Sequence, residues 1–212
     1  MSLIYWLAGA AAVGFAGRAL LGSAKAVGGS PPMVPTPPTK DFGVPFAPAT
    51  GRIWPVVGGE RSVPFTSPTG VVTGNSGTMF HASRESGLRW HAGVDLQAAP
   101  GQKIAAMEDG VVLGFVPGFV GLDTVVVQHP SVVAVYAEVT KALGLAVGAK
   151  VSAGQQIAVG TINKDGRSML HLELWKTGNA PKGFVPWYQK DPPPRGLLDP
   201  TRYLLALAKA AL

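Results

Sequence analysis

Short apolar runs separated by turn residues fill the second half of this chain and favour strands over a helical bundle. The runs are rich in β-branched residues or alternate apolar with polar side chains, which is the pattern of strands four to eight residues long. They cover 103–107, 110–115, 124–129, 132–139, 147–151, 155–159 and 168–175. The 28 glycines and 19 prolines supply the turns between them. The sequence therefore predicts a mainly β fold, an antiparallel β-sheet or barrel-like sandwich.

The N-terminal segment has a different composition. Residues 3–21 are apolar apart from Arg18, and about 20 apolar residues in a helix span the core of a bilayer. We expect residues 1–30 to be an N-terminal membrane anchor helix with its flank. Two other interpretations stay open, a signal peptide cut near the Ala-Lys-Ala of residues 24–26 and a helix buried in an assembly.

A proline-rich linker separates this segment from the expected globular domain. Residues 31–48 hold seven prolines, which predicts a stiff, extended spacer. The domain is expected over residues 49–212. Within it we expect a long irregular loop over 60–90, a proline-rich loop over 177–198 and a short amphipathic C-terminal helix over 201–211.

Charge and cysteine content narrow the range of partners. The chain has no cysteine, which excludes disulfides and thiolate metal sites. Its net charge is +6, and a basic protein suits nucleic acid, an anionic cell wall or lipid headgroups. The sequence has no run of Lys or Arg and no nucleic-acid-binding motif, so nucleic acid is not an expected partner.

Residues 89–96, RWHAGVDL, place a histidine and an aspartate four positions apart. Imidazole and carboxylate are zinc ligands, and a catalytic zinc usually takes three protein ligands and a water. Residues four apart in a strand are separated by roughly 13 Å. One metal can therefore join His91 and Asp95 only if the backbone bends, and Gly93 permits a bend. A third ligand must come from elsewhere, and the remaining histidines are His81, His129 and His171.

Several motifs follow one another as in the lysostaphin-like, or LytM-type, zinc endopeptidases. They are HAGVDL, PGQKIAAMEDGVV, VVVQHP, VYAEV, VGAKVSAGQQIAVG and LHLELW. The resemblance covers about residues 51–205. It implies zinc as the cofactor, with His91, Asp95 and His171 as the ligands, and a first strand near residues 53–56. Those enzymes cut peptide cross-links in bacterial cell walls, so the resemblance implies peptidoglycan as the substrate.

Two positions depart from the family pattern. The family has an HxH motif where this chain has Met169 followed by Leu and His171. It also has a catalytic histidine two residues after an aromatic, where this chain has Tyr136, Ala137 and Glu138. Glu138 is our candidate catalytic residue, because a glutamate is the general base of HExxH zinc peptidases. A surface or salt-bridged glutamate in an inactive site is the alternative.

Four residues are candidates for substrate binding: His81, Arg84, Trp187 and Tyr188. His81 and Arg84 lie in the first predicted loop, and His81 could instead be a fourth metal ligand or a surface histidine. Trp187 and Tyr188 lie in the second loop and could line a groove for glycan or peptide.

Two further polar residues belong to predicted strands. Glu173 follows His171 by two positions and shares its face of a regular strand. It could orient His171 or pair with a lysine. His129 is expected to be structural.

Together with the family resemblance, these observations predict a membrane-anchored, zinc-dependent peptidoglycan endopeptidase. The alternative is an inactive zinc-binding module with a structural or wall-binding role. The expected location is a membrane, with the domain outside the bilayer. The virion membrane of a membrane-containing phage and a bacterial cell envelope suit the sequence equally, and either would make the chain part of a larger assembly.

Overall fold

The computed structural model describes residues 51–66, 72–74, 76–117, 121–179, 187–188 and 194–209. All of them belong to one compact unit, Lys40–Leu212. The predicted anchor (1–30) and linker (31–48) lie outside the described residues. Within the described ranges, no helix combines the length and the apolar character needed to cross a bilayer.

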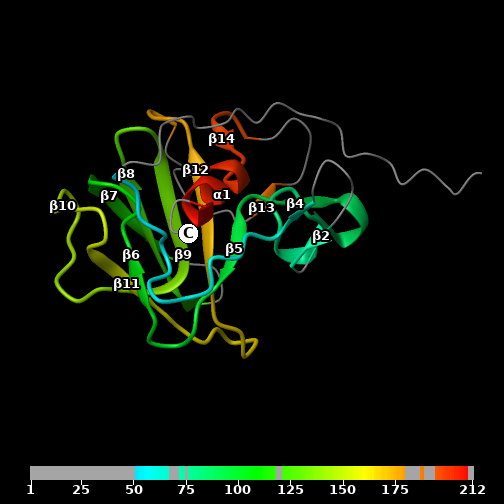
Figure 1. Cartoon of the computed structure of the whole chain (residues 1–212), viewed down its shortest axis with the longest axis horizontal. Coiled ribbons are helices and arrows are strands. Elements are labelled where there is room, and N and C mark those ends of the chain that lie inside the picture. The colour runs from blue at the N-terminus through cyan, green and yellow to red at the C-terminus, as the bar shows by residue number, and fades with distance from the viewer. Residues whose placement is uncertain are drawn as a thin grey trace, which may run out of the picture. The chain divides into compact units, whose positions relative to one another are not determined.

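An antiparallel sheet of nine strands carries most of the domain (Figure 1). Six of its strands lie side by side in the order β10 (Lys150–Val151), β7 (Gly110–Pro117), β8 (Asp123–Gln128), β9 (Val133–Lys141), β11 (Gln156–Gly160) and β6 (Lys103–Ala105). The other three meet at β12 (Met169–Trp175), which pairs with β9, β5 (Val94–Gln97) and β14 (Leu197–Leu198). The prediction of a mainly β, antiparallel fold is confirmed.

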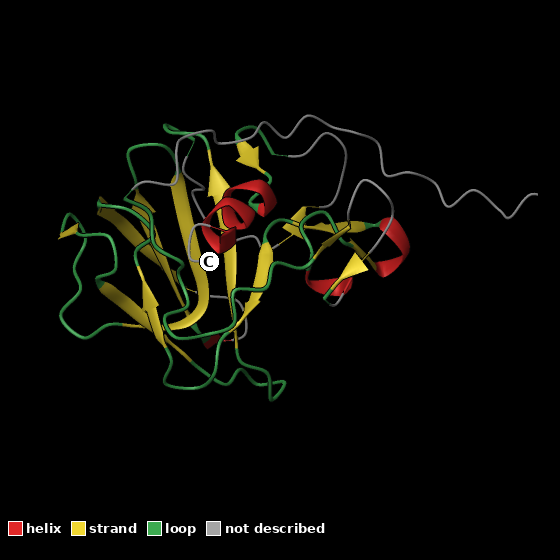
Figure 2. Cartoon of the chain, in the orientation of Figure 1, coloured by secondary structure: helices red, strands yellow, loops and turns green. Residues whose placement is uncertain are grey.

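Strand β9 changes partner along its length. Residues 133–137 pair with β12, whereas residues 139–141 pair with β11. Glu138, between them, is an extra residue against β8, because two successive residues of β8 face Val139 and Ala137. Glu138 has a left-handed backbone, with φ at 61°. Such a β-bulge bends a strand and increases its twist, and β9 is visibly curved in Figure 2.

Both faces of β9 and β12 are buried. On the first face, β9 contributes Ala134 and Tyr136 to the main core, and β12 contributes its three leucines, Leu170, Leu172 and Leu174. On the second face, Val133, Val135 and Ala137 of β9 pack with Ala92 and Trp175. Each large apolar side chain buried in this way stabilises the fold by about 1.5–3 kcal/mol. The alternation also places His171 and Glu173 on the second face.

The prediction of a first strand near residues 53–56 was wrong. Residues 53–56 make only one isolated bridge, between Val56 and Ile104 of β6. The flanking backbone does follow β6, since Ala105 N donates to the carbonyl oxygen of Pro55 at 2.8 Å. Pro55 has no N–H, so it cannot donate a hydrogen bond in return, and the pairing is interrupted there.

The prediction of two irregular loops was also wrong, because each region contains short strands or 3-10 helices. The region 60–90 holds β1 (Phe65–Thr66), β2 (Val72–Thr73), η1 (Ser76–Thr78), β3 (Ser83–Arg84), η2 (Glu85–Gly87) and the start of β4 (Arg89–His91). The region 177–198 holds β13 (Trp187–Tyr188) and β14. Strands β13, β4 and β3 form a separate small sheet. Strands of two or three residues are too short to show a readable period.

The C-terminal helix begins where predicted. α1 spans Thr201–Lys209, and residues 210–211 lie outside the described range. Asp199 Oδ1 accepts a hydrogen bond from the backbone N–H of Thr201 at 2.8 Å, which caps the helix. Its apolar side buries Tyr203, Leu204 and Leu207 against the main core.

Candidate metal centre

Strands β5 and β12 bring two of the predicted zinc ligands opposite each other. Asp95 and His171 are direct partners in the antiparallel pair. His91 is the last residue of β4, and the chain bends at Gly93 before β5 begins. A Cβ atom on Gly93 would overlap the carbonyl oxygen of Leu172, so this approach of the two chains requires glycine.

One donor atom from each of His91, Asp95 and His171 converges on a single point. His91 Nε2 and His171 Nδ1 lie 3.1 and 2.8 Å from Asp95 Oδ1. The two nitrogens are 3.0 Å apart. Two imidazole nitrogens and one carboxylate oxygen are a donor set found in catalytic zinc sites. The three side chains, called the metal cluster below, could therefore hold a zinc ion.

Hydrogen bonds hold the two ring nitrogens that point away from the metal cluster's centre. His91 Nδ1 lies 2.7 Å from the carbonyl oxygen of Met79, and His171 Nε2 lies 3.2 Å from a Glu173 carboxylate oxygen. Trp175 Nε1 donates to the other oxygen of Glu173 at 2.8 Å. A carbonyl oxygen can only accept, and so can a carboxylate. With a metal bound, each ring would keep its proton on the outer nitrogen and present a lone pair inward, as zinc-ligating histidines do.

The electrostatics of the metal cluster favour a positive charge at its centre. Burial alone raises the pKa of Asp95, but the hydrogen bonds from His171 and His91 outweigh it and hold that pKa well below its ordinary value. Burial alone lowers the pKa of His171, but the hydrogen bonds to Asp95 and Glu173 outweigh it and raise the pKa to about 10. The two carboxylates therefore favour a positive charge on or beside the buried imidazole of His171. A divalent metal supplies such a charge as well as a proton does.

Glu138 lies at the bulge of β9, next to the residue that faces His171 across the β9–β12 pair. Its side chain is buried, and Asn163 Nδ2 donates to its Oε2 at 3.3 Å. Burial raises the pKa of Glu138 above its ordinary value. The charge of His171 opposes this increase, and the charge of Asp95 adds to it. The candidate base therefore lies within electrostatic range of the metal cluster.

Met169 occupies the start of β12, two residues before His171. It faces Gln97 of β5 across the pair and is half-buried. A thioether can neither transfer a proton nor donate a hydrogen bond. Of the two substituted family positions, only Glu138 can act as a base.

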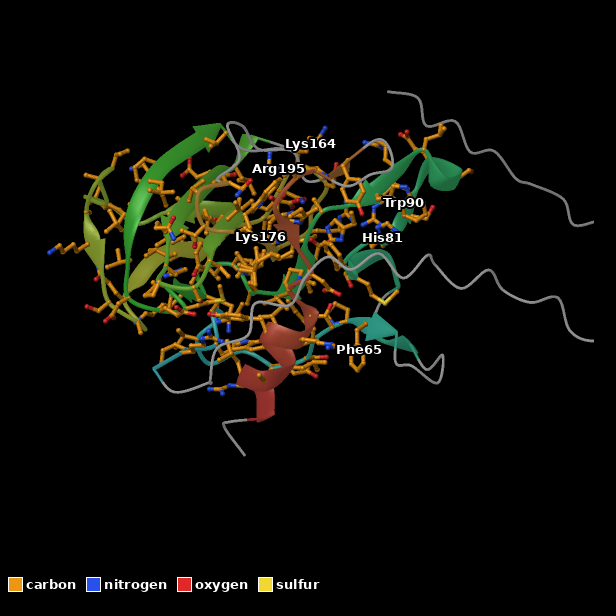
Figure 3. The ribbon with its side chains drawn as sticks, turned by 90° about the horizontal axis from the view of Figure 1, so that it is seen from above. Phe65, His81, Trp90, Lys164, Lys176 and Arg195 are labelled. Carbon is orange, nitrogen blue, oxygen red and sulfur yellow. The ribbon has the colours of Figure 1, made fainter. Side chains whose placement is uncertain are left out.

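His81 stacks on Trp90 close to the metal cluster. The two ring centroids are 4.3 Å apart and the planes differ by 5°, and Figure 3 shows the two side chains next to each other. His81 Nδ1 is hydrogen-bonded to Tyr188 Oη. The backbone N–H of His81 donates to the carbonyl oxygen of His91 at 2.9 Å. His81 is half-buried, and among the described residues the group that could hold a metal does not include it.

Arg84 and Trp187 belong to the strands on either side of β4. Arg84 Nη2 donates to the carbonyl oxygen of Gly77, within the same loop. Trp187 faces His91 across the β13–β4 pair. The small sheet therefore gathers all four predicted substrate-binding residues around the strand that ends in a predicted metal ligand. Their contact with a substrate stays a prediction.

His129 lies in a buried hydrogen-bonded chain. Its Nδ1 lies 3.0 Å from the carbonyl oxygen of Asp109, and its Nε2 lies 2.8 Å from Tyr136 Oη. Tyr136 Oη in turn accepts from the backbone N–H of Met107 at 3.0 Å. Burial lowers the pKa of His129. These are the contacts of a neutral, structural histidine.

The sequence of the site region matches a known family. Residues 89–182 match the model described as Peptidase family M23. Over these residues the chain carries a peptidase M23 domain. The metal cluster and Glu138 lie inside the matched range of this M23 domain. The predicted substrate-binding residues lie outside it, with His81 and Arg84 before the range and Trp187 and Tyr188 after it. No protein of curated function matches the chain in sequence.

Three solved structures illustrate what this chain is similar to. Cbpa from L. salivarius REN is 22% identical, with 71% of this chain and 99% of that chain covered and a TM-score of 0.45. The catalytic domain of lysostaphin from Staphylococcus simulans is 18% identical, with 60% and 89% covered and a TM-score of 0.45. The catalytic domain of a point mutant of the prophage-encoded M23 protein EnpA from Enterococcus faecalis is 26% identical, with 44% and 72% covered and a TM-score of 0.36.

Two residues of the site were missed by sequence analysis, Asn163 and Met79. Asn163 carries a turn signal, because its side-chain oxygen accepts from the backbone N–H of Asp165 and Arg167, each at 3.0 Å. Nothing local relates that turn to Glu138. Met79 acts through its backbone carbonyl, so its side chain carries no signal.

Proposed function

We propose that this protein is a zinc-dependent endopeptidase that cuts cross-link peptide bonds of peptidoglycan. The observation that carries the proposal is the convergence of His91 Nε2, Asp95 Oδ1 and His171 Nδ1 on one point. This donor set lies in an M23 domain, and the outer hydrogen bonds of both histidines suit zinc ligands.

The chain's own residues would divide the work as follows. The metal cluster would hold a zinc ion, which would supply Lewis acidity toward the peptide carbonyl and the attacking water. Glu138 accepts the proton of that water. Its burial supports this role, because a pKa raised from its usual range brings a carboxylate closer to the operating pH. The substrate would lie against the small sheet, in contact with His81, Arg84, Trp187 and Tyr188.

Residues 3–21 would anchor the protein in a membrane, with the M23 domain outside the bilayer. The virion membrane of a phage and the bacterial cell envelope are both suitable settings, and in each the chain would belong to a larger assembly. Flotation with lipid vesicles tests the anchor. The full chain should rise with the vesicles, and a chain without residues 1–30 should not. Equal behaviour of the two chains would remove the anchor from the proposal.

A second function is favoured by a specific observation. Met169 and Glu138 stand at the two positions where the family has auxiliary histidines, and the metal cluster is complete without them. The domain could keep its metal for stability and serve as a structural or wall-binding module.

One substitution separates the two functions. Removing a general base typically costs about 10²–10⁴ in rate. Glu138→Gln should therefore lower digestion of purified peptidoglycan by that factor and leave one zinc per chain, because glutamine keeps the shape but cannot accept the proton. Glu60→Gln, an exposed position, is the matched control and should digest at the natural rate. Solubilised peptides and metal content are the two measurements.

Other outcomes assign the alternative. A natural chain that binds zinc and wall but digests nothing is the module. If Glu138→His together with Met169→His then digests wall, the module derives from an enzyme that lost its base. Natural digestion that Glu138→Gln leaves intact would mean that another group is the base.

A further inference from the structure

Residues 142–149 connect β9 to β10 through two successive turns of the same kind. Leu145 N donates to Ala142 O, and Ala149 N donates to Ala146 O, each at 3.2 Å. The third residue of each turn is a glycine with positive φ, 77° at Gly144 and 80° at Gly148. This is the conformation of a type II turn. We call residues 142–149 the double turn.

The double turn presents apolar side chains at both tips. Leu143 and Val147 occupy the second position of each turn and are 103% and 63% exposed. Turn tips are usually polar or glycine. The fourth residues, Leu145 and Ala149, pack against the main core instead. The double turn is therefore held at its base and offers two apolar tips to its surroundings.

Two lysines flank the double turn, and two carboxylates lie near them. Lys141 precedes it and Lys150 follows it, and the sequence has no acidic residue between Glu138 and Asp165. The carboxylates of Asp123 and Asp109 accept hydrogen bonds from backbone N–H groups close to the double turn. Asp123 accepts from the backbone N–H of Lys141 at 2.9 Å, and Asp109 accepts from that of Ala153 at 2.8 Å.

More apolar surface adjoins the second turn. Gly148 N donates to the carbonyl oxygen of Val112 on β7 at 2.8 Å. The residues on either side of Val112, Val111 and Leu113, are exposed. Two exposed apolar residues of β7 therefore lie close along the chain to the residue that bonds the second turn.

We propose that the double turn contacts the headgroup region of an anionic lipid bilayer, with Leu143 and Val147 inserted and Lys141 and Lys150 at the phosphates. A stable protein interface covers about 800 Å² on each partner and centres on packed side chains. Two protruding aliphatic side chains offer far less. A lipid interface takes up such tips without a complementary surface, and anionic lipids attract each nearby lysine.

This contact would orient the domain relative to the membrane. In Figure 1, β10 lies at one end of the nine-stranded sheet and β4 lies beyond its other end. A bilayer held at the double turn would therefore leave the small sheet facing away from it, toward the wall. This inference rests on the membrane location given in the proposed function. It goes further by assigning a second, peripheral contact to the M23 domain itself.

The absence of cysteine allows a direct test on the full chain. Leu143→Cys and Val147→Cys are each labelled with the fluorophore NBD, and the protein is reconstituted in phosphatidylcholine vesicles with or without phosphatidylglycerol. Leu88→Cys is the matched control, since Leu88 is a leucine 68% exposed next to β4. Quenching by lipids that carry a nitroxide on the acyl chain should be at least about threefold stronger at 143 and 147 than at 88 on anionic vesicles. Lys141→Gln with Lys150→Gln should remove most of that difference.

Each contrary result has a distinct meaning. If the chain floats with vesicles but labels at 143 and 147 stay as exposed to water as the label at 88, the double-turn contact is wrong and the anchor stands. A chain that does not float overturns both, and its peptidoglycan digestion is judged separately. The labels could also be shielded from water before vesicles are added, on a chain that has the mass of a dimer. That result would mean that the turn tips contact a second copy of the chain.

Discussion

The side-chain amide of Asn163 donates a hydrogen bond to the carboxylate of Glu138, with 3.3 Å between Nδ2 and Oε2. Both side chains are buried. The amide oxygen of Asn163 is taken up by the backbone N–H groups of Asp165 and Arg167. The amide group is thereby orientated with its N–H toward Glu138, so the turn over residues 163–167 positions the candidate base.

Asn163→Asp should move the acid limb of the pH profile for peptidoglycan digestion to higher pH. The aspartate keeps an oxygen for the two backbone donors but turns a second carboxylate toward Glu138, which raises the pKa of Glu138. A base with a higher pKa loses its deprotonated form at a higher pH. Asp165→Asn, at an exposed position of the same turn, is the control. A profile that moves equally in both variants, or in neither, would argue against Glu138 as the base.

Glu173→Gln should weaken zinc binding by about 10–100-fold, because it removes the charge that Glu173 presents to the outer nitrogen of His171. Trp175→Phe removes only the donor to the other carboxylate oxygen and should have a smaller effect in the same direction. Competition with a chromophoric chelator measures both affinities, and circular dichroism checks the fold. Unchanged affinity in Glu173→Gln would leave Glu173 with a packing role only.

The neutral state of His129 predicts that acid lowers the free energy of unfolding. The ordinary pKa of 6.5 is lowered in the folded protein, so the unfolded chain binds the proton more readily. Above about pH 6.5, His129 is neutral in both states and does not reduce the free energy of unfolding. As the pH falls from there toward the folded pKa, the free energy of unfolding decreases by up to about 1.4 kcal/mol per pH unit. Urea unfolding of the natural chain should therefore be steeper in pH than that of His129→Gln. A chelator is present in all samples, so that loss of metal at low pH does not affect the comparison. If the free energy of unfolding depends equally on pH in both chains, the prediction is wrong.

Tyr203→Phe should lower the free energy of unfolding by about 1.5–3 kcal/mol, the cost of a hydrogen bond to a charged group. Tyr203 Oη donates to the buried carboxylate of Glu108 at 2.5 Å. Arg52 Nε lies 2.8 Å from the same carboxylate, and Ser131 Oγ donates to it at 2.9 Å. The cluster ties α1 and the start of the domain to one residue. Arg202 is exposed on the same helix, and the free energy of unfolding of Arg202→Ala should lie within about 0.5 kcal/mol of that of the natural chain. An equal loss of stability in both variants would mean that the helix is responsible and not the hydrogen bond to Glu108.

The long strands were predictable because their signal is local. β7, β8, β9 and β12 all lie where the runs of β-branched or alternating residues predicted them, with ends shifted by a few residues. β10 is shorter than predicted, since Gly148 places the preceding residues in a turn. The alternation of β12 also implied that Glu173 shares a face with His171, as the structure shows.

The metal cluster was predictable only in part. The HxGxD spacing pointed to His91 and Asp95 with a bend at Gly93, and the choice of His171 as third ligand came from a family resemblance. The structure explains that choice, because His171 is the register partner of Asp95. No spacing along the chain contains this relation, since it joins residues 76 positions apart.

By itself, then, the sequence determined where the long strands β7, β8, β9 and β12 lie, that turns between them fall at glycine and proline, and that a histidine and an aspartate flank a bend. Only the tertiary structure decided that β9 leaves β12 for β11 at Glu138, and that Asn163 lies against it. The physical reason is the range of the interactions. A strand's period and a turn's φ depend on neighbouring residues, whereas register and bulges are settled when distant strands pack both faces of β9 and β12 into the two cores.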